Sequence, residues 1–457
     1  MKGLTAEKIC DVCGGKLFYA EKGDPNAEVT NVVIDSRLIA AGGVFIASKG
    51  ERVDGHDFIP QVFEKGAAAV VCSVLPKEAY GICILVDDPF KALRDIASFY
   101  RKGLSVKIAG ITGSVGKTST KEFTAAVLSE NYKTCATKGN HNNEIGVPLT
   151  LLRIMDEDEC AVVEMGINHF GEMSRLTAMV KPDIAVITGI GECHLENLGG
   201  DRSGVLKAKS EIFEGLSENG VAVLNGEDDK LSEIEEVKGR KPLRYGFGRN
   251  RGFYICAEDY KDNGLYGSSA KFCFDNGESV DVEVPLPGKH MMLNALAAAC
   301  IGRWLGMSAE KIKKGIEKVE PAGGRSNVIK KESFTLIDDC YNANPTSVKA
   351  ALDLLSKTPG KKTAILGDMF ELGENEKALH GQVGRYAAER GVDLLICVGT
   401  LSDEMFKEAR TAGLEALWYE STDAFIEKGL FMPEKGSTVL IKASHGMHFE
   451  KIVERLK

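Results

Sequence analysis

The sequence lacks an uninterrupted apolar run approaching the ~18 residues that a bilayer-spanning helix needs. Its first residues, MKGLTAEKICDVCGG, also lack the apolar stretch of a secretory signal. We therefore expect a cytoplasmic protein that has no membrane partner.

Basic residues are not in excess. Lys and Arg number 57 against 66 Asp and Glu, which gives a formal net charge of −9 and a pI near 5.6. A nucleic-acid binder needs concentrated Lys and Arg to neutralise phosphates, so no nucleic-acid partner is expected. Local basic pockets for small phosphates remain compatible with this composition.

The 12 cysteines do not form a pattern typical of a disulfide framework, because many stand inside apolar segments such as VVCSV, AAACIG and LLICVG. Cys10 and Cys13 make one CxxC, but no second pair supplies the other half of a zinc ribbon. We expect ordinary reduced thiols.

The length and the order of elements predict an α/β protein of three domains. A chain of 457 residues with 44% hydrophobic residues is long enough for about three cores. We place the domains at 1–104, 105–320 and 321–457. We expect a small mixed α/β domain, then a central, mostly parallel domain of the P-loop ATPase type, then a Rossmann-like α/β domain.

Short apolar runs separated by helical patterns support this division. The first domain has strand-like runs at 29–36, 42–47, 67–73 and 82–88, and a helical pattern at 90–103. The second has such runs at 105–112, 160–166, 183–190 and 221–225, an antiparallel annex between 243 and 287, and a helix near 291–305. The third has strand-like runs at 334–339, 363–368, 394–399 and 438–443.

Segment 105–118, SVKIAGITGSVGKT, predicts a phosphate-binding loop between a buried strand and a helix. Glycines let backbone N–H groups approach phosphate oxygens, and a helix N-terminus favours negative charge. Lys117 would contact the terminal phosphates, and the Thr118 hydroxyl would contact Mg²⁺. The full pattern G-x-x-x-x-G-K-[ST] is absent, because Ile111 stands where its first glycine belongs. The expected phosphate-binding residues are Gly113, Ser114, Gly116, Lys117 and Thr118.

Two polar residues follow strands that should end at the same edge of the middle sheet. Glu164 follows CAVV and His194 follows DIAVITGI, so both would lie beside the phosphate loop, where open α/β sheets bind ligands. A carboxylate there suits a hard cation, although a solvent-facing glutamate or a structural histidine gives the same pattern. By pattern alone, Lys209 is a solvated helix lysine. Asn140, Asn142 and Asn143, in GNHNNEIGVPLT, either supply short polar donors in a loop or simply form turns.

Nine segments occur in a fixed order: TGSVGKTST, GNHNNEIGVPL, EMGINHFGEM, LKAKSEIF, LNGEDD, GKHMMLNALAA, GGRSN, DDCYNANPTS and GDMFELG. Together they resemble the Mur ligases over nearly the whole chain, and DDCYNANP followed by GDMFELG is the most discriminating part. The resemblance is closest to the members that add D-alanyl-D-alanine to UDP-N-acetylmuramoyl (UDP-MurNAc) tripeptide. TNVVIDSR (30–37) and GERVDGHDF (50–58) also resemble family segments that hold the UDP-sugar.

The resemblance implies an ATP-dependent amide ligase of peptidoglycan synthesis. ATP would phosphorylate the terminal carboxylate of UDP-MurNAc-tripeptide, and the amine of D-Ala-D-Ala would attack the acyl phosphate to give UDP-MurNAc-pentapeptide. The three domains would bind the UDP-sugar, ATP and the dipeptide, in chain order. The implied ligands are ATP, Mg²⁺ and these two small-molecule substrates, and we expect a monomer.

The resemblance also implies roles for single residues. Lys117, Lys209 and His194 would be catalytic, and Lys209 would be carbamoylated by CO₂ to give an anionic ligand. Mg²⁺ would be held by Thr118, Glu164, His194 and carbamoylated Lys209. Beyond the phosphate loop, the nucleotide would contact Asn294, Arg325, Asp338 and Asn342. The substrates would contact Ser36, Arg37, Asn143, Asn344 and Lys442.

One segment departs from the family pattern. Where the family commonly has Lys-Gly-Ser-Arg, this chain reads Lys-Ala-Ser-His from Lys442 to His445. An imidazole cannot replace the five fixed donors of a guanidinium, so a bidentate carboxylate clamp is not expected at His445. His445 either donates one hydrogen bond or is structural.

Three alternatives stay open at the level of sequence. A sister ligase that adds the third amino acid resembles a different signature, Asp-Asn-Pro-Arg, which is absent. A folylpolyglutamate synthetase starts close to its phosphate loop, whereas about 104 residues precede the loop here. A non-catalytic nucleotide-binding module would need neither the Glu164, His194 and Lys209 set nor a third α/β domain. The sequence does not distinguish diaminopimelate from lysine as the third peptide residue.

Overall fold

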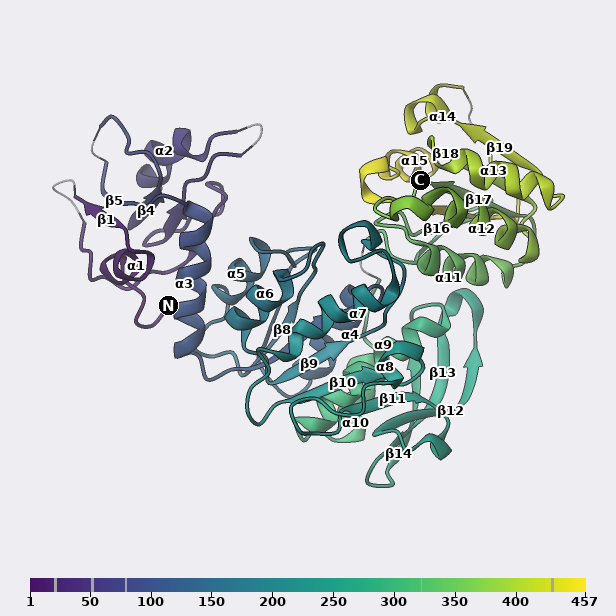
Figure 1. The fold of residues 1–457 in the computed structure, drawn as a ribbon, viewed down its shortest axis with the longest axis horizontal. Helices are drawn as coiled ribbons and strands as arrows, with labels where there is room; N and C mark the ends of the chain where they lie inside the picture. The colour runs from purple at the N-terminus through teal and green to yellow at the C-terminus, as the bar shows by residue number, and fades with distance from the viewer. Residues whose placement is uncertain (20–22, 51–52, 79, 322, 429–430) are drawn as a thin grey trace.

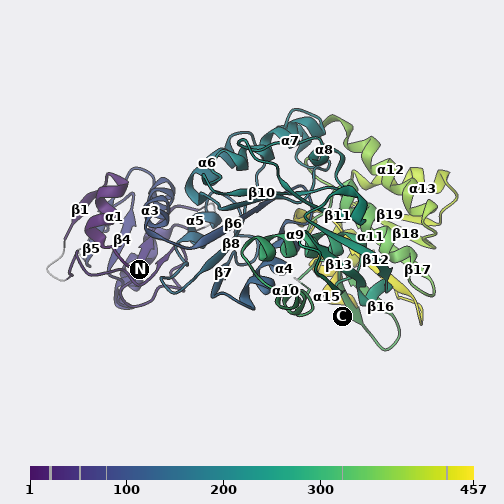
Figure 2. The ribbon, with the colours of Figure 1, turned by 90° about the horizontal axis from the view of Figure 1, so that it is seen from below.

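The structure is a computed structural model that describes all residues except 20–22, 51–52, 79, 322 and 429–430. Three β-sheets follow one another along the chain, and each is covered by helices (Figure 1). Figure 2 shows the first sheet at one end of the molecule and the last sheet beyond the large middle one. The expected α/β class with three sheet-containing regions is confirmed.

The first sheet has five strands in the order β1-β5-β4-β3-β2. Its neighbours pair in parallel except β1, which runs antiparallel to β5. The strands are β1 (Lys16–Phe18), β2 (Val32–Val33), β3 (Val44–Ile46), β4 (Ala69–Cys72) and β5 (Ile82–Leu85), and the helices beside them are α1 (Ala6–Cys13) and α2 (Ile59–Glu64).

Helix α3 (Pro89–Gly103) connects the first sheet to the middle one. Asp88 caps it by accepting hydrogen bonds from the next N–H groups, and Pro89 stands in its first turn, where its missing donor costs nothing. At the other end, Tyr100 donates to Ile154 O (2.7 Å) and Arg101 Nε donates to Val180 O (2.8 Å). These bonds fix α3 against the middle region.

The middle sheet has nine strands in the order β14-β13-β12-β11-β10-β9-β6-β8-β7. The strands from β7 to β12 pair in parallel, and β13 and β14 continue the sheet as an antiparallel annex. The strands are β6 (Lys107–Thr112), β7 (Thr134–Ala136), β8 (Cys160–Glu164), β9 (Ile184–Ile187), β10 (Val221–Asn225), β11 (Leu243–Phe247), β12 (Ile255–Asp262), β13 (Ser268–Phe274) and β14 (Ser279–Val284).

Helices cover both faces of the middle sheet, as its uninterrupted apolar strands require. In β8, for example, Ala161 and Val163 point into one core while Val162 points into the other. The core under α9 contains Val162, and the core that contains Ala161 continues into the first and last sheets. The helices are α4 (Lys117–Ser129), α5 (Gly146–Leu151), α6 (Glu172–Val180), α7 (Arg202–Ser210), α8 (Asp229–Ser232), α9 (Lys289–Trp304) and α10 (Ala309–Ile316).

The last sheet has six strands in the order β15-β16-β20-β17-β18-β19, parallel except for the β15–β16 pair. They are β15 (Asn327–Lys330), β16 (Thr335–Asp338), β17 (Lys362–Gly367), β18 (Leu394–Val398), β19 (Ala416–Tyr419) and β20 (Thr438–Lys442). The helices are α11 (Pro345–Ser356), α12 (Glu376–Glu389), α13 (Ser402–Thr411), α14 (Thr422–Lys428) and α15 (Glu450–Leu456).

Two expectations from composition can be compared with the fold. All 12 cysteines are free thiols, and ten of them are buried, as expected for reduced core residues. None of the helices in the described part of the chain is both long enough and apolar enough to span a bilayer.

Candidate active site

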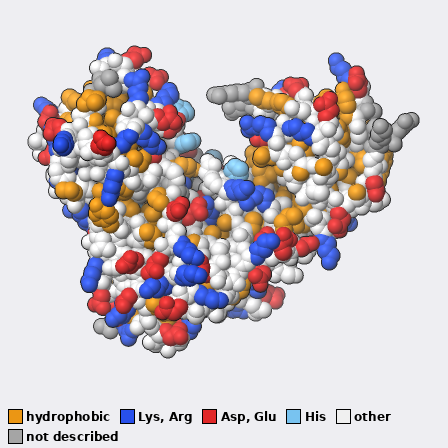
Figure 3. Space-filling model, turned by 180° about the vertical axis from the view of Figure 1, so that it is seen from behind, with side chains coloured by type: hydrophobic (Ala, Val, Ile, Leu, Met, Phe, Trp, Pro, Cys, Tyr) orange, Lys and Arg blue, Asp and Glu red, His pale blue; other side chains and the backbone are white. Residues whose placement is uncertain are grey.

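A cavity of about 870 Å³ opens at the carboxyl edge of the middle sheet. Its walls come from all three sheet regions: Phe90 and Arg94 on α3, the loops after the middle strands, and the segment from Arg325 to Ser347. Figure 3 shows the hollow between the two outer lobes, with Lys, Arg and His side chains on its walls. A site at this edge is the usual position for ligands of open α/β sheets.

The phosphate loop forms the floor of this cavity. Gly113 and Gly116 both have positive φ, +152° and +82°, which explains why glycines are needed at these turns. Gly116 precedes the first residue of α4, so the free N–H groups of the helix face the cavity. A Cβ at Gly116 would lie 2.7 Å from Asn294 Oδ1, so the loop also needs glycine for its approach to α9.

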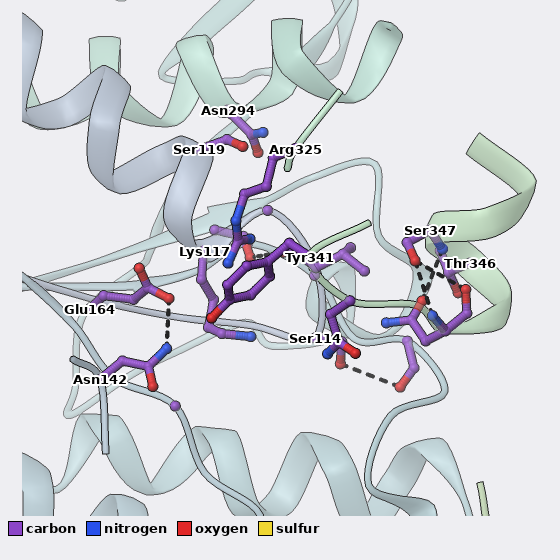
Figure 4. A pocket seen from close by; sticks show the side chains of 18 of the residues that line it. Ser114, Lys117, Ser119, Asn142, Glu164, Asn294, Arg325, Tyr341, Thr346 and Ser347 are labelled. Carbon is purple, nitrogen blue, oxygen red and sulfur yellow. Dashed lines mark hydrogen bonds between the residues drawn. The ribbon is translucent and has the colours of Figure 1, made fainter. Parts of the chain in front are cut away.

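Glu164 is the centre of a buried polar cluster at the end of β8. Its side chain is fully buried, and both its oxygens accept from Thr118 Oγ1 at 2.9 Å. Asn142 Nδ2 donates to Glu164 Oε1 at 2.8 Å (Figure 4). The sequence predicted Glu164 and Thr118 here. Of the loop asparagines that the sequence offered as polar donors, Asn142 holds the carboxylate, whereas Asn143 caps the turn before α5 by accepting from Gly146 N (2.9 Å).

Two lysines lie close to one another here: Lys117 is half-buried and lines the cavity, and Lys209 is buried beneath it. Burial lowers the pKa of Lys117, Arg325 lowers it further, and Cys193 and Glu164 oppose the shift. Burial also lowers the pKa of Lys209 from 10.5 to about 8, and the charge of Lys117 acts in the same direction. Lys209 is 1% exposed, so it is not the solvated helix lysine that its local pattern suggests. Lys117 Nζ donates to Gly113 O at 2.8 Å.

Arg325 and Tyr341 form the opposite wall. The Arg325 guanidinium lies 3.9 Å from the centre of the Tyr341 ring, and His445 stacks on the same ring with centroids 5.6 Å apart (Figure 4 shows Arg325 and Tyr341). Asn294 accepts from Thr120 Oγ1 at 3.1 Å, which holds its amide over the start of α4. His445 therefore packs on an aromatic ring, which is the structural alternative that its departure from the family pattern left open.

Lys442 is buried at the end of β20 and is hydrogen bonded into the cavity wall. Its Nζ donates to Asp339 Oδ2 (2.6 Å) and to Asn342 O (2.9 Å). Asp339 also accepts from Ser326 N at 2.9 Å. Asp338 is buried and does not line the cavity, whereas Asp339 does. The acidic side chain that reaches this wall is therefore the neighbour of the one that the resemblance implied.

Asn344 presents the N-terminus of α11 to the cavity. It accepts from Ser347 N (2.9 Å), and Ser347 Oγ accepts from Asn344 N (3.1 Å), which together form a capping box. The cap uses the side-chain oxygen, so the amide nitrogen is not needed for it. Thr346 and Ser347 follow in the first turn and also line the cavity (Figure 4).

His194 lines the cavity from the loop after β9. It has positive φ (+52°) and its Nδ1 contacts the carboxylate of Glu371, which belongs to the GDMFELG segment of the last sheet region. The imidazole holds the Glu371 carboxylate in its charged form and so lowers the Glu371 pKa. Neither local pattern nor periodicity signals this contact, because it joins residues far apart in sequence.

Ser36 and Arg37 lie in the first sheet region, apart from the residues that line the cavity. Ser36 is buried, and its carbonyl accepts from Lys65 Nζ at 2.9 Å. Arg37 is exposed and pairs with Asp35, which lowers the Asp35 pKa to about 2. The nearby 50–58 segment is only partly described, since 51–52 lie outside the described residues.

The cavity therefore unites most of the predicted site. The predicted site residues that line the cavity are Ser114, Gly116, Lys117, Asn143, Glu164, His194, Asn294, Arg325, Asn342, Asn344 and Lys442. Gly113, Thr118 and Lys209 lie in or beneath its floor rather than in its lining. Within the described ranges, no three His, Cys, Asp or Glu side chains gather into a metal-binding cluster, so any metal here would take further ligands from elsewhere.

Comparison with known protein families accounts for most of the chain. Residues 111–302 match the Mur ligase middle domain. Residues 324–445 match the Mur ligase glutamate ligase domain, and residues 28–101 match the Mur ligase family catalytic domain.

Individual relatives match from end to end. The UDP-N-acetylmuramoyl-tripeptide–D-alanyl-D-alanine ligase of Escherichia coli is 35% identical over 460 residues, covering 100% of this chain and 99% of the relative. A crystal structure of MurF from Acinetobacter baumannii has a TM-score of 0.86 and 32% identity, covering 99% of this chain and 98% of that one. MurF from Thermotoga maritima in complex with ADP has a TM-score of 0.79 and 28% identity, covering 93% and 96%.

Proposed function

The chain belongs to the Mur ligase family, and from this premise we propose that it joins D-alanyl-D-alanine to UDP-MurNAc-tripeptide with cleavage of ATP to ADP and phosphate. The product is UDP-MurNAc-pentapeptide, a precursor of peptidoglycan. The observation that carries this proposal is the full-length identity of 35% to a ligase of that name. It favours this reaction over the addition of the third amino acid, folate glutamylation or nucleotide binding without catalysis.

We assign one substrate to each sheet region. The first region, residues 1–104, would hold the UDP-sugar with Ser36 and Arg37. The middle region, 105–320, would hold ATP, and the last region, 321–457, would bring the dipeptide. The cavity supports this division, because its lining combines side chains from all three regions at one sheet edge.

ATP would lie across the floor and the Arg325 wall of the cavity. The triphosphate would contact the N–H groups before α4 and the Lys117 ammonium, both of which favour negative charge. Asn294 and Tyr341 offer an amide and a ring face to the nucleoside, and Arg325 offers a cation to its phosphates. Asn342 and the Lys442–Asp339 pair would complete this wall.

The buried Glu164 cluster fits a Mg²⁺ ion. Its donors are a carboxylate and the hydroxyl of Thr118, which are the oxygen ligands that Mg²⁺ prefers. Two protein ligands are enough, because Mg²⁺ usually takes its remaining ligands from water and substrate phosphates. His194 and carbamoylated Lys209 would complete the set from the protein side. Mg²⁺ bound there would neutralise charge on the transferring phosphoryl group.

Lys209 fits the carbamoylation that the family resemblance implies. Only the neutral amine can attack CO₂, and burial lowers the Lys209 pKa to about 8. A carbamate at this position would convert a buried cation into an anion beside Lys117. The product would therefore be stabilised by the same lysine that destabilises the protonated amine.

The reaction needs two displacements in the same cavity. A carboxylate oxygen of the tripeptide attacks the γ-phosphorus and ADP leaves; then the dipeptide amine attacks the acyl carbon and phosphate leaves. Both steps build negative charge on oxygen, which Lys117 and the N–H groups of the loop are placed to stabilise. The acyl phosphate must be protected from water, so the three regions have to close around it.

One assay tests the proposal directly. Purified protein is incubated with ATP, Mg²⁺, D-Ala-D-Ala and either the diaminopimelate or the lysine form of UDP-MurNAc-tripeptide, and the products are weighed by mass spectrometry. We expect pentapeptide and one ADP for each peptide bond. Phosphate release that does not depend on the dipeptide, or no release at all, would contradict the proposal. The same assay shows whether the third residue of the substrate peptide is diaminopimelate or lysine.

We also propose that the protein acts as a cytoplasmic monomer. Its two nucleotide-linked substrates, ATP and the UDP-sugar, are those of the cytoplasm. One chain supplies every wall of the cavity, so the proposed site needs no residue from a second copy.

A further inference from the structure

Lys121 is a fully buried lysine that the proposed reaction does not use. It lies on α4, one helical turn after Lys117, and its residue exposure is 1%. Burying an ammonium costs free energy unless it is paired and hydrogen bonded. A methionine would fill the same volume without that cost, so the function of the ammonium has to be sought in its partners.

The Lys121 ammonium bonds to the first residue after β7. Its Nζ donates to Thr137 O at 3.1 Å and pairs with Glu122 Oε1 at 2.6 Å. Thr137 is 2% exposed, and its N–H donates to Val162 O at 3.0 Å, which extends the β7–β8 pairing. Lys121 therefore fixes the point where the chain leaves the sheet and enters the loop that carries Asn142.

Thr137 in turn holds Glu164. Thr137 Oγ1 accepts from Glu164 N at 3.0 Å, and the Glu164 carboxylate accepts from Asn142 Nδ2 at 2.8 Å. Asn142 O accepts from Gly166 N at 2.8 Å, which ties the same loop to the chain beyond Glu164. A series of hydrogen bonds thus runs from Lys121 through Thr137 to the backbone N–H of Glu164, the residue that carries the carboxylate.

We propose that Lys121 is a positioning residue that sets the place of the Glu164 carboxylate and of Asn142, and so determines how tightly Mg²⁺ joins the bound nucleotide. This inference rests on the proposed function, because it takes Glu164 as the Mg²⁺ ligand. Residues that orient a metal ligand commonly change metal affinity 10–100-fold when they are replaced. Lys121 is not among the residues that line the cavity, so it would act through Thr137 and not by its own contact with the nucleotide.

The experiment measures ADP binding by calorimetry with and without Mg²⁺. For the unchanged protein, the ratio of the two dissociation constants gives the factor by which Mg²⁺ tightens ADP. In Lys121→Met we expect this factor to fall at least about 10-fold, while Mg²⁺-free affinity stays within about twofold. Thr137→Val should give the same loss, and Thr137→Ser, which keeps the hydroxyl, should retain the factor.

Thr124→Val is the matched control. Thr124 is fully buried on the same helix, and its hydroxyl has no hydrogen-bond partner among the residues that the structure describes. In this variant, Mg²⁺ should tighten ADP binding by the same factor as in the unchanged protein. If Lys121→Met does not fold, the comparison of Thr137→Val with Thr137→Ser tests the inference on its own.

Two outcomes would overturn the inference. One is a Lys121→Met protein with the unchanged Mg²⁺ factor, and the other is an equal loss of affinity with and without Mg²⁺. If the unchanged protein shows no Mg²⁺-dependent binding of ADP, the proposed function fails first. The two failures are therefore distinguishable.

Discussion

Lys117 stands where three favourable features for phosphate meet: the glycine turn, the free N–H groups of α4 and its own cation in the cavity lining. Removing the cation leaves the first two in place. We expect Lys117→Ala to lower turnover by at least two orders of magnitude, about 3 kcal/mol in barrier, because one preorganised charge donor is lost. Dipeptide-dependent phosphate release measures the effect.

Lys107→Ala is the control for this prediction. Lys107 begins the strand that leads into the same loop, but it is exposed and pairs with Asp183 at 2.9 Å on the surface. Such a pair contributes about 1 kcal/mol or less, so turnover should stay near that of the unchanged protein. Near-normal turnover in a folded Lys117→Ala protein would refute the assignment of the loop.

If Lys209 is carbamoylated, the occupancy of the carbamate and the turnover should depend on CO₂ and on pH. At pH 7.5 roughly a quarter of an amine with a pKa of about 8 is neutral, against about one part in a thousand at a pKa of 10.5. Carbamoylation consumes the neutral amine and releases a proton, so at a fixed pressure of CO₂ its occupancy should rise between pH 6.5 and pH 8.5. The carbamate is measured by carbon NMR with labelled CO₂, and its loss on degassing should lower turnover.

Two variants separate Lys209 from its surroundings. Lys209→Ala should remove both the carbamate signal and turnover, and added short-chain carboxylates should restore part of the turnover. Lys207→Ala on the same helix should change neither, because Lys207 is exposed. The carbamate role fails if Lys209→Ala keeps full turnover.

The sequence predicted the residues whose position follows from a strand end or a loop motif. Glu164 comes directly after an apolar run, and Lys117 stands in the glycine loop that follows another. It did not distinguish Asp339 from Asp338, because successive residues at a strand end point to opposite faces and the sequence does not say which face meets the cavity. The contact of Asn142 with Glu164 and the place of Tyr341 in the cavity wall were not predicted, because both depend on contacts made across the fold.

At the scale of elements, the apolar strands and the antiparallel pairs from β12 to β14 were predictable. The annex was expected from residue 243, but β11 (Leu243–Phe247) pairs in parallel with β10 and β12, and some short strands were not predicted. Among these, β7, β15 and β19 have three or four residues each. β3, β4 and β5 are equally short, but they lie inside longer apolar runs that the sequence shows. The unpredicted strands form because a neighbouring strand is already in place, as β7 does beside β8. This matters for function, since the loop that leaves β7 carries Asn142.

Helix α11 offers a test that separates folding from binding. Asn344→Ala removes the cap and should lower the free energy of unfolding by about 1 kcal/mol. Asn344→Asp keeps an oxygen that accepts from Ser347 N, so its stability should stay near that of the unchanged protein. If the Asn344 amide binds the dipeptide, both variants should raise the KM for D-Ala-D-Ala. Denaturant unfolding and steady-state kinetics measure the two effects, and an unchanged KM in Asn344→Asp would limit Asn344 to capping.

At the scale of the whole molecule, the site exists only because three sheets meet. Arg325 and Lys117 line one cavity although they are 208 positions apart in the chain. The His194–Glu371 contact joins the middle and last regions beside that cavity. Sequence motifs indicated which residues belong together but not how the regions are oriented, because orientation depends on packing between surfaces that no local pattern encodes.

The proposed division of substrates among the regions predicts separate footprints in hydrogen exchange. ADP with Mg²⁺ should slow exchange in 113–118 and in 325–342, because it would bind both walls and stabilise the state in which they are folded. A ligand at 100 times its Kd stabilises that state by about 2.7 kcal/mol, or roughly 100-fold in the exchange of amides that need local opening. UDP-MurNAc should instead protect 32–46 in the first sheet.

Each ligand serves as the control for the other, because both are nucleotides of similar charge. If ADP protected 32–46 as strongly as the phosphate loop, the division of labour would be wrong, whatever the ligase assay shows. With both ligands present, we also expect slower exchange at the start of α3, where Phe90 and Arg94 line the cavity. This added protection should exceed the sum of the two separate effects, since α3 connects the two regions and closure around the substrates would bury its first turn.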